Sequence, residues 1–236
     1  MLKINIIPQN EQAIQFLSDN DNKTAKEPFI HAGAFKYISW ALVNENIYFP
    51  THRNGAFDMY VYLVGQFRFS GDSIDGMHHF KEGDMLIMQS GSTNAPSIRY
   101  IGPNFKAFEF WFTEDGLLKG VEKPDYMKFT SSQFPINIKN DVLIRHIFGE
   151  GAPVEHINDL KVKELILPPD TQISYTLNPS RMFGIYVIKG NGVISDNDYT
   201  DGDAIEITQT DKEHGNVLID SKGDYSTHIM LFDMMV

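Results

Sequence analysis

Short apolar runs, some alternating with polar residues, follow one another from Phe35 onward and are separated by Gly, Pro, Asn and Asp. Such runs are typical of β-strands, because successive side chains of a strand point to opposite faces of a sheet. In the first half the pattern predicts strands at 59–64, 66–70, 85–89 and 107–112. In the second half it predicts strands at 163–167, 172–177, 184–188, 192–195, 204–208, 216–220 and 228–233.

Helical signals are scarce in comparison. Residues 12–17 fit one or two helical turns, and no longer helical pattern follows them. Many short strands divided by turn residues are typical of β-barrels and sandwiches. The chain is therefore predicted to be all-β.

One pattern of strand, glycine turn and Gly-Asp turn occurs twice. It runs from Tyr60 to Gln89, with Gly83-Asp84 at the second turn, and again from Ile185 to Thr208, with Gly202-Asp203. A repeat that is offset by about half of the chain indicates two copies of one small domain rather than one large sheet.

Two tandem barrels follow from this repeat. We expect an N-terminal barrel in residues 1–120, which includes a polar leading segment and holds the candidate site. We expect a C-terminal barrel in residues 121–236, which contains no His-x-His pattern and is predicted to be structural. The polar, glycine-containing segment 113–133 is predicted to link them.

Composition and charge narrow the function classes. Of the 236 residues, 42% are hydrophobic, which is enough to fill packed cores. The net charge of −11 disfavours nucleic acids and anionic membranes as partners, because phosphate groups would be repelled. The absence of cysteine excludes disulfides and thiolate chemistry. No signal peptide or long apolar run is present, so we expect a cytoplasmic protein.

The candidate chemistry lies in the segment from Phe49 to Gly65. This segment contains His52-x-Asn54, and Asp58 follows four residues later. Residues i and i+2 of a strand point to the same face, so His52 and Asn54 are predicted to face the barrel interior together.

With this spacing the segment resembles the first motif of the cupin superfamily, in which His-x-His is followed by an acid and a glycine. Gly83 and Gly91 match the frame of the second cupin motif, and Asn94 stands where that motif has its third histidine. Two tandem cupins of this length resemble the pirin and quercetinase-like bicupins. The resemblance covers most of residues 35–236.

The resemblance implies two jelly-roll-type cupin barrels, that is, a bicupin. It also implies a site for a divalent metal, Fe, Ni, Cu or Zn, with His52 and Asp58 as the ligands that remain. The motif is degenerate, because His52 is its only imidazole, and Pro96 and Ile98 stand at the pirin positions of the third histidine and the acid. An amide is a weak ligand for these metals, so we expect no bound metal.

Each candidate residue keeps an alternative role. His52 is either a ligand or a hydrogen-bonded residue at the barrel mouth, and Asp58 either binds a metal or accepts hydrogen bonds from nearby backbone. Asn54 and Asn94 either bind an organic ligand or occupy turns. Aromatic residues either fill the core or line a pocket. The predicted ligand pocket comprises His52, Asn54, Asp58, Asn94, Tyr60 and Phe110.

Two functions fit this site. The first is a pirin-like bicupin that binds a small organic ligand, such as an aromatic one, or a protein partner, with weak or no catalysis. The alternative is a metal-dependent dioxygenase of the quercetin 2,3-dioxygenase type. No residue is assigned a catalytic role. His78 and His79 are adjacent, so at most one could face a pocket, and both are expected to be exposed.

Overall fold

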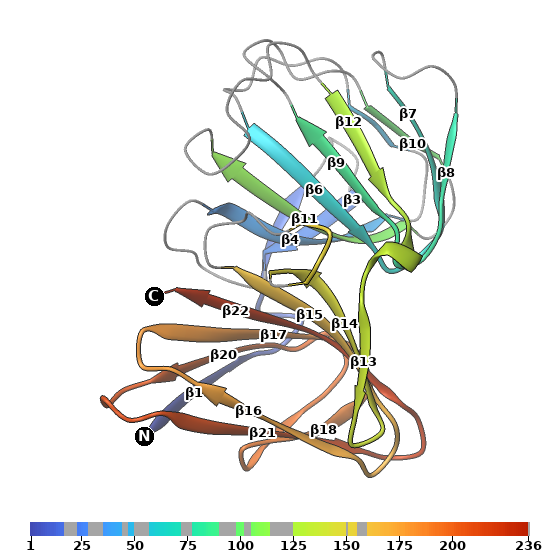
Figure 1. Cartoon of the computed structure of the whole chain (residues 1–236). Coiled ribbons are helices and arrows are strands. Elements are labelled where there is room, and N and C mark those ends of the chain that lie inside the picture. Colours follow the sequence, from blue (N-terminus) through green and yellow to red (C-terminus); the bar gives the residue numbers. More distant parts are fainter. Residues whose placement is uncertain are drawn as a thin grey trace. The chain divides into compact units, whose positions relative to one another are not determined.

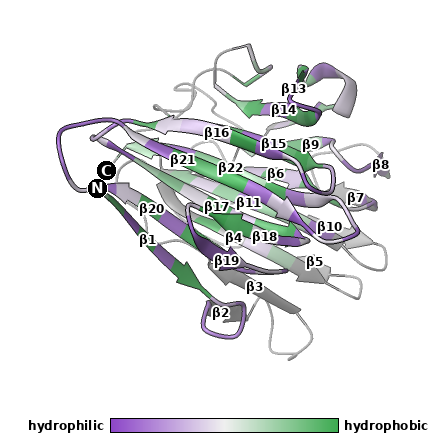
Figure 2. Cartoon of the chain, turned by 90° about the horizontal axis from the view of Figure 1, so that it is seen from below, coloured by the Kyte–Doolittle hydropathy of each residue, from purple (hydrophilic) through white to green (hydrophobic). Residues whose placement is uncertain are grey.

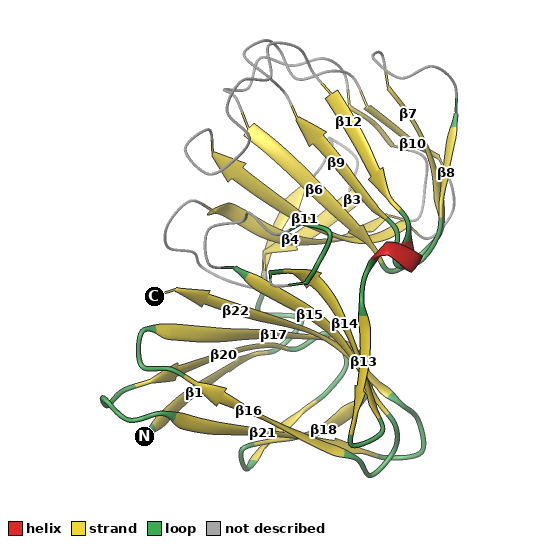
Figure 3. Cartoon of the chain, viewed as in Figure 1, coloured by secondary structure: helices red, strands yellow, loops and turns green. Residues whose placement is uncertain are grey.

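The computed structural model describes residues 1–16, 23–27, 35–43, 47–49, 57–71, 77–89, 98–101, 105–113, 125–149, 151–154 and 160–235. Within these residues the structure consists of antiparallel strands and one 3-10 turn, η2 (Ser131–Gln133), as Figure 3 shows. The all-β prediction is confirmed. The prediction of helical turns at residues 12–17 was wrong, because Ala13–Phe16 forms a strand. No helix in the described residues has the length and apolar character needed to span a membrane.

The chain folds as two compact units. The N-terminal unit comprises Ala13–Gln133, and the C-terminal unit comprises Phe134–Val236 together with Met1–Gln12. Each unit contains one seven-stranded and one four-stranded sheet (Figure 1). Two sheets that enclose an interior are the arrangement of a jelly-roll-type barrel.

In the N-terminal unit the seven-stranded sheet has the order β12-β9-β6-β11-β4-β3-β2. These strands are β12 (Asp125–Phe129), β9 (Met85–Gln89), β6 (Phe57–Leu63), β11 (Phe105–Thr113), β4 (Phe35–Val43), β3 (Lys23–Glu27) and β2 (Ala13–Phe16). The four-stranded sheet consists of β5 (Ile47–Phe49), β10 (Ile98–Ile101), β7 (Phe67–Gly71) and β8 (His78–Phe80), in that order.

In the C-terminal unit the seven-stranded sheet has the order β1-β20-β17-β22-β15-β14-β13. These strands are β1 (Leu2–Ile7), β20 (Ala204–Gln209), β17 (Arg181–Lys189), β22 (Thr227–Met235), β15 (Lys161–Leu167), β14 (Val142–Phe148) and β13 (Ile136–Lys139). The four-stranded sheet consists of β16 (Gln172–Leu177), β21 (Gly215–Lys222), β18 (Asn191–Ile194) and β19 (Asn197–Tyr199). Every strand predicted from the pattern is present in one of these sheets.

The first strand of the chain belongs to the C-terminal unit, although residues 1–120 were expected to form the N-terminal barrel. Strand β1 pairs with β20, with Ile4 opposite Ile207. Leu2, Ile4 and Ile6 pack against the core of this unit, whereas Lys3 and Asn5 are exposed. The alternation of hydrophobic and hydrophilic residues along β1 is visible in Figure 2. Because every second residue of β1 is apolar, pairing with β20 places this apolar face against the core of the barrel.

Part of the predicted linker 113–133 is also a strand. Strand β12 pairs with β9 in the N-terminal unit, at the position that β1 takes beside β20 in the C-terminal unit. The boundary between the two units falls after Gln133. The seven-stranded sheets of the two units therefore correspond strand for strand, and β12 and β1 are the corresponding edge strands.

The repeated Gly-Asp turns make equivalent hydrogen bonds in the two units. The backbone N–H of Leu63 donates to the carbonyl of Asp84 at 3.0 Å, and that of Val187 donates to the carbonyl of Asp203 at 2.9 Å. The side chains of Asp84 and Asp203 accept the backbone N–H three residues earlier, at 3.0 and 2.8 Å. Both preceding glycines have a φ of 81°, in the left-handed region that favours glycine.

The interior of the C-terminal barrel is an apolar cluster whose members alternate along the strands. From β17 it takes Phe183, Ile185 and Val187, and from β22 it takes Ile229 and Leu231. Leu63 and Val187 make the same backbone contact with their Gly-Asp turns, so they occupy corresponding positions. Counting back along each strand, Phe183 and Ile185 then correspond to Met59 and Val61. This correspondence identifies the interior face of β6.

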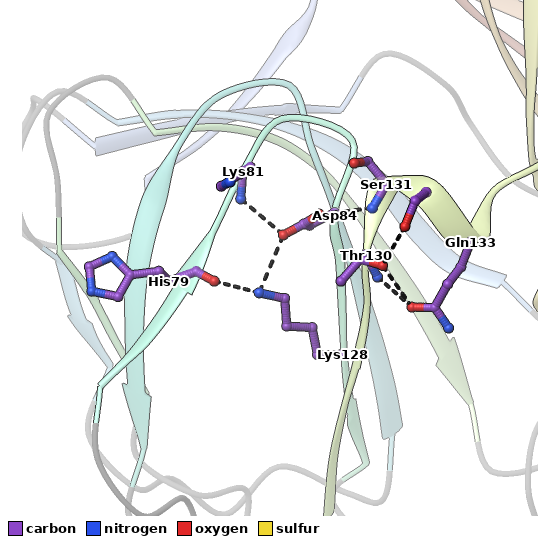
Figure 4. A network of polar contacts seen from close by, with 8 residues as sticks. His79, Lys81, Asp84, Lys128, Thr130, Ser131 and Gln133 are labelled. Atoms are coloured by element: carbon purple, nitrogen blue, oxygen red, sulfur yellow. Dashed lines mark hydrogen bonds and ion pairs between the residues drawn. The ribbon is translucent and has the colours of Figure 1, made fainter.

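Asp84 carries more contacts than its counterpart (Figure 4). Its side chain also accepts the backbone N–H of Ser131 at 2.9 Å and forms an ion pair with Lys128 at 3.3 Å. Asp84 is 4% exposed. Lys128 is on β12 and Ser131 is on η2, so one buried carboxylate connects the Gly-Asp turn to the end of the N-terminal unit.

We predict that Asp84→Ala lowers the free energy of unfolding of the N-terminal unit by about 2–3 kcal/mol, because it removes a buried carboxylate that accepts two partly buried backbone N–H groups and pairs with Lys128. Both tryptophans, Trp40 and Trp111, lie in this unit, so urea unfolding followed by tryptophan fluorescence reports on it. The exposed neighbour Glu82 provides the control, and Glu82→Ala should unfold as the unaltered protein does. Equal midpoints for the two variants would contradict the prediction.

Candidate functional site

Three of the predicted pocket residues, His52, Asn54 and Asn94, lie outside the described residues. Asp58 belongs to β6, where it stands opposite Gln89 of β9 and Phe112 of β11. The cage of ligands expected from the sequence is therefore still a prediction.

The strands that flank these candidates are described and are paired with one another. Strand β5 pairs with β10, with Phe49 opposite Ile98, and β6 pairs with β9. The first candidate segment follows β5 and precedes β6, and the second follows β9 and precedes β10. The register is compatible with the predicted proximity of the histidine and the two asparagines, and does not test it.

Tyr60 and Phe110 are brought together by the fold. They stand opposite each other on β6 and β11, and their exposed fractions are 2% and 0%. The Tyr60 ring also lies edge-on to Phe112, with centroids 5.2 Å apart. Tyr60 alternates with the interior positions Met59 and Val61 on β6, and Phe110 stands opposite Tyr60, so both lie on the other face of the sheet from the barrel interior.

The interior side of this sheet contains a carboxylate that the sequence analysis missed. Glu109 of β11 stands opposite Val61 and Ser39, and Val61 is an interior position. Glu109 is 4% exposed. The available signal was a single acid within the aromatic run Phe108–Phe112, and strand alternation separates Glu109 from Phe108 and Phe110.

The described histidines do not form a metal centre. No group of three or more His, Asp or Glu side chains suited to a metal ion is found in the part of the chain that the structure describes. His78 and His79 are both exposed on β8, which confirms the expectation for this pair. His146 of β14 lies 3.1 Å from the side-chain nitrogen of Asn137. Burial lowers the pKa of His146, and the ammonium group of Lys163 lowers it further.

His228 belongs to a buried polar cluster in the C-terminal unit. Its Nε2 atom lies 2.8 Å from Oε1 of Glu164, and Nη1 of Arg145 donates to Oε2 of Glu164 at 2.5 Å. Glu164 is 1% exposed. A buried carboxylate needs such partners, because an unpaired charge in the interior is costly. We assign this cluster to stability.

The comparisons with known proteins agree with this architecture. Residues 149–234 match the family model described as the quercetinase C-terminal cupin domain. A comparison with curated protein sequences found no match.

The solved structures that resemble the chain do so over nearly its whole length. One is bacterial pirin YhhW from Escherichia coli in complex with nickel(II), with a TM-score of 0.71, 16% identity, and 99% of each chain covered. Another is quercetin 2,3-dioxygenase from Acinetobacter baumannii, with a TM-score of 0.72, 16% identity, and 100% of this chain and 87% of that chain covered. A third is GK1651 from Geobacillus kaustophilus, with a TM-score of 0.71 and 15% identity. At these identities the likeness establishes the fold.

We predict that Glu164→Ala destabilises the C-terminal unit by about 3–5 kcal/mol, because it removes the buried counter-charge of Arg145 and the hydrogen-bond partner of His228. Thermal unfolding followed by circular dichroism would measure the loss. The exposed Glu213 supplies a matched control, and Glu213→Ala should change the midpoint little. A Glu164→Ala variant as stable as the control would show that the cluster does not stabilise the unit.

Proposed function

We propose that the N-terminal barrel of this chain, which shares the fold of a pirin and of a quercetin 2,3-dioxygenase, binds a small organic ligand and has weak or no catalytic activity. The observation that carries this proposal is the set of donor groups available to the barrel. The set combines one imidazole, amides and carboxylates with an apolar interior. The amides of this set suit hydrogen bonding to an organic molecule better than they suit a transition metal.

The donor set does not fit a tightly bound divalent metal. First-row metals are held by imidazole and carboxylate groups, and amide oxygens bind them weakly. In the motif segments His52 is the only imidazole, since Asn54 and Asn94 replace the other two. In the described interior Glu109 would add one carboxylate. The pirin with nickel(II) shares the fold, but no step of a metal-dependent reaction follows from the residues of this chain.

The described interior gives the ligand its chemical character. Around Glu109, the interior positions include Met59, Val61 and Ala107, which are buried and apolar. Ligand sites commonly combine apolar walls with a few polar groups that fix orientation. A flat aromatic molecule that carries hydroxyl groups matches this surface, because its ring can contact the apolar side chains and a hydroxyl can donate to a carboxylate or an amide.

A protein partner and a metal-dependent dioxygenase are the alternatives. The dioxygenase is favoured by the likeness to quercetin 2,3-dioxygenase. It requires that His52 and its neighbours hold a metal despite the missing imidazoles. Metal content and ligand binding, measured on the same purified protein, separate these possibilities.

We predict that the protein, after incubation with Ni²⁺ or Fe²⁺ and removal of free metal, retains about a tenth of an equivalent or less, because amides are poor ligands. Elemental analysis would measure the content. The double variant Asn54→His with Asn94→His restores the imidazoles and should raise it several-fold. One full equivalent in the unaltered protein, lost in His52→Ala, would support the dioxygenase instead.

We predict that the flavonol quercetin stabilises the metal-free protein. A ligand that binds only the folded state adds about 2.7 kcal/mol at roughly one hundred times its Kd, and calorimetry would detect the shift. Glu109→Gln should reduce the stabilisation, whereas Glu82→Gln, an exposed acid in the same unit, should not. An unchanged melting temperature with quercetin and with simpler hydroxylated aromatics would contradict an aromatic-ligand role and favour a protein partner.

A further inference from the structure

The C-terminal barrel contains a cavity of about 170 Å³ that was not expected from the sequence. Its lining comes from β15, β16, β17 and β22, and includes Lys161, Lys163, Tyr175, Thr176, Phe183 and Asp233. We call it the Lys163 cavity. Its volume suits a molecule with a single ring rather than one the size of a drug.

The Lys163 cavity occupies the place in its barrel that Glu109 occupies in the other. Leu231, which lines the cavity, stands opposite Lys163 and Ile185. Glu109 stands opposite Ser39 and Val61, and the Gly-Asp turns equate Val61 with Ile185. The cavity therefore lies at the end of the C-terminal barrel that corresponds to the candidate site of the N-terminal barrel.

The charge of the cavity is positive in a chain whose net charge is −11. Within the described residues, Lys161 and Lys163 form no ion pair with an acidic side chain. Asp233 is engaged by Arg181, whose Nε donates to Oδ1 and whose Nη2 donates to the Asp233 carbonyl at 3.0 Å. Asp233 also lines the cavity and stands opposite Lys161, but it is paired with Arg181, so the positive side chains around the cavity outnumber this one carboxylate.

Tyr175 adds a third donor to this set. Its hydroxyl oxygen is buried and has no hydrogen-bond partner in the described part of the chain. The ammonium group of Lys163 lies 5.1 Å from the centre of the Tyr175 ring, and the Phe183 ring lies 6.3 Å away, edge-on. A buried hydroxyl and a partly buried cation both cost free energy unless a partner offsets their lost hydration. Every group that lacks a partner here donates hydrogen bonds.

The protonation of these groups fits an anion. Burial raises the pKa of Tyr175, so its hydroxyl stays neutral and can donate. Burial lowers the pKa of Lys163, Asp233 opposes the shift, and Lys161 and Lys139 lower the pKa further. A bound anion would reverse this effect, because it favours the charged amine.

We propose that the Lys163 cavity binds a small aromatic carboxylate. The carboxylate lies between the ammonium groups of Lys161 and Lys163 and accepts a hydrogen bond from the Tyr175 hydroxyl. The ring lies against Phe183 and Leu231. This site is independent of the ligand proposed for the N-terminal barrel, and the C-terminal barrel is then a second binding module rather than a structural copy.

The test is calorimetric titration of the whole protein with sodium benzoate, benzamide and inorganic phosphate. Benzoate should bind at one site, whereas benzamide, which has the same shape without the charge, and phosphate, which has charge without a ring, should bind at least tenfold more weakly. Equal binding of benzoate and benzamide would overturn the role of the lysines. Equal binding of benzoate and phosphate would overturn the role of the ring.

Variants locate the site. Lys163→Met keeps the length of the side chain without its charge, and Tyr175→Phe removes only the hydroxyl, so each should weaken benzoate binding about tenfold. The exposed Lys222 provides the control, and Lys222→Met should bind as the unaltered protein does. The proposal fails if Lys163→Met and Tyr175→Phe, folded by circular dichroism, both bind benzoate with unchanged affinity.

The pH dependence gives a second readout. Lys163 is positive below its lowered pKa, so the affinity for benzoate should fall as the pH rises through that value, and should fall less in Lys163→Met. The titratable groups that act on Lys163 are Lys161 on its own strand, Lys139 on β13, His146 on β14, Asp233 on β22 and Tyr175 on β16. His146 loses its own charge at lower pH than a free histidine and so does not produce the alkaline loss. An affinity that is constant up to the alkaline range would contradict the proposal.

Discussion

The carboxylates of Asp84 and Asp203 hold corresponding strands of the two barrels in the same register. Each caps a Gly-Asp turn, and each turn ties its strand to the neighbouring strand through paired backbone hydrogen bonds. In a sheet, a shift of one residue exchanges the two faces. The turns therefore help to keep Val61 and Glu109 on the interior face of the sheet, and Tyr60 and Phe110 on the opposite face.

The duplicated scaffold supports two different chemistries at the same place. At corresponding positions the N-terminal barrel has Ser39 and Glu109, and the C-terminal barrel has Lys163 and Leu231. The first site therefore presents a carboxylate within apolar walls, and the second presents cations around an aromatic cavity. The apolar layers deeper in each barrel are retained. When the core side chains are retained and only the side chains at the barrel mouth differ, one fold can carry different binding sites.

The likeness to a nickel-containing pirin and to a quercetin dioxygenase concerns the backbone. Metal affinity depends on which side chains the backbone carries, and a single imidazole among amides binds first-row metals weakly. The same barrel fold can thus hold nickel(II) in one protein and carry a motif with few imidazoles in another. The side chains of the motif, rather than the topology, decide between these functions.

The sequence by itself predicted the strands with the clearest apolar patterns, the repeat and the two-barrel architecture, because a two-residue alternation and turn residues are local properties. The interior residues of β6 also follow from that alternation once its face is known. Only the tertiary structure decided which strands become neighbours: β1 joins β20 about two hundred residues away, and β12 occupies what had been predicted as a linker. It also decided that Glu109 is interior and that Lys161, Lys163 and Tyr175 surround one cavity, because a strand pattern specifies its own period but not its partners across the sheet.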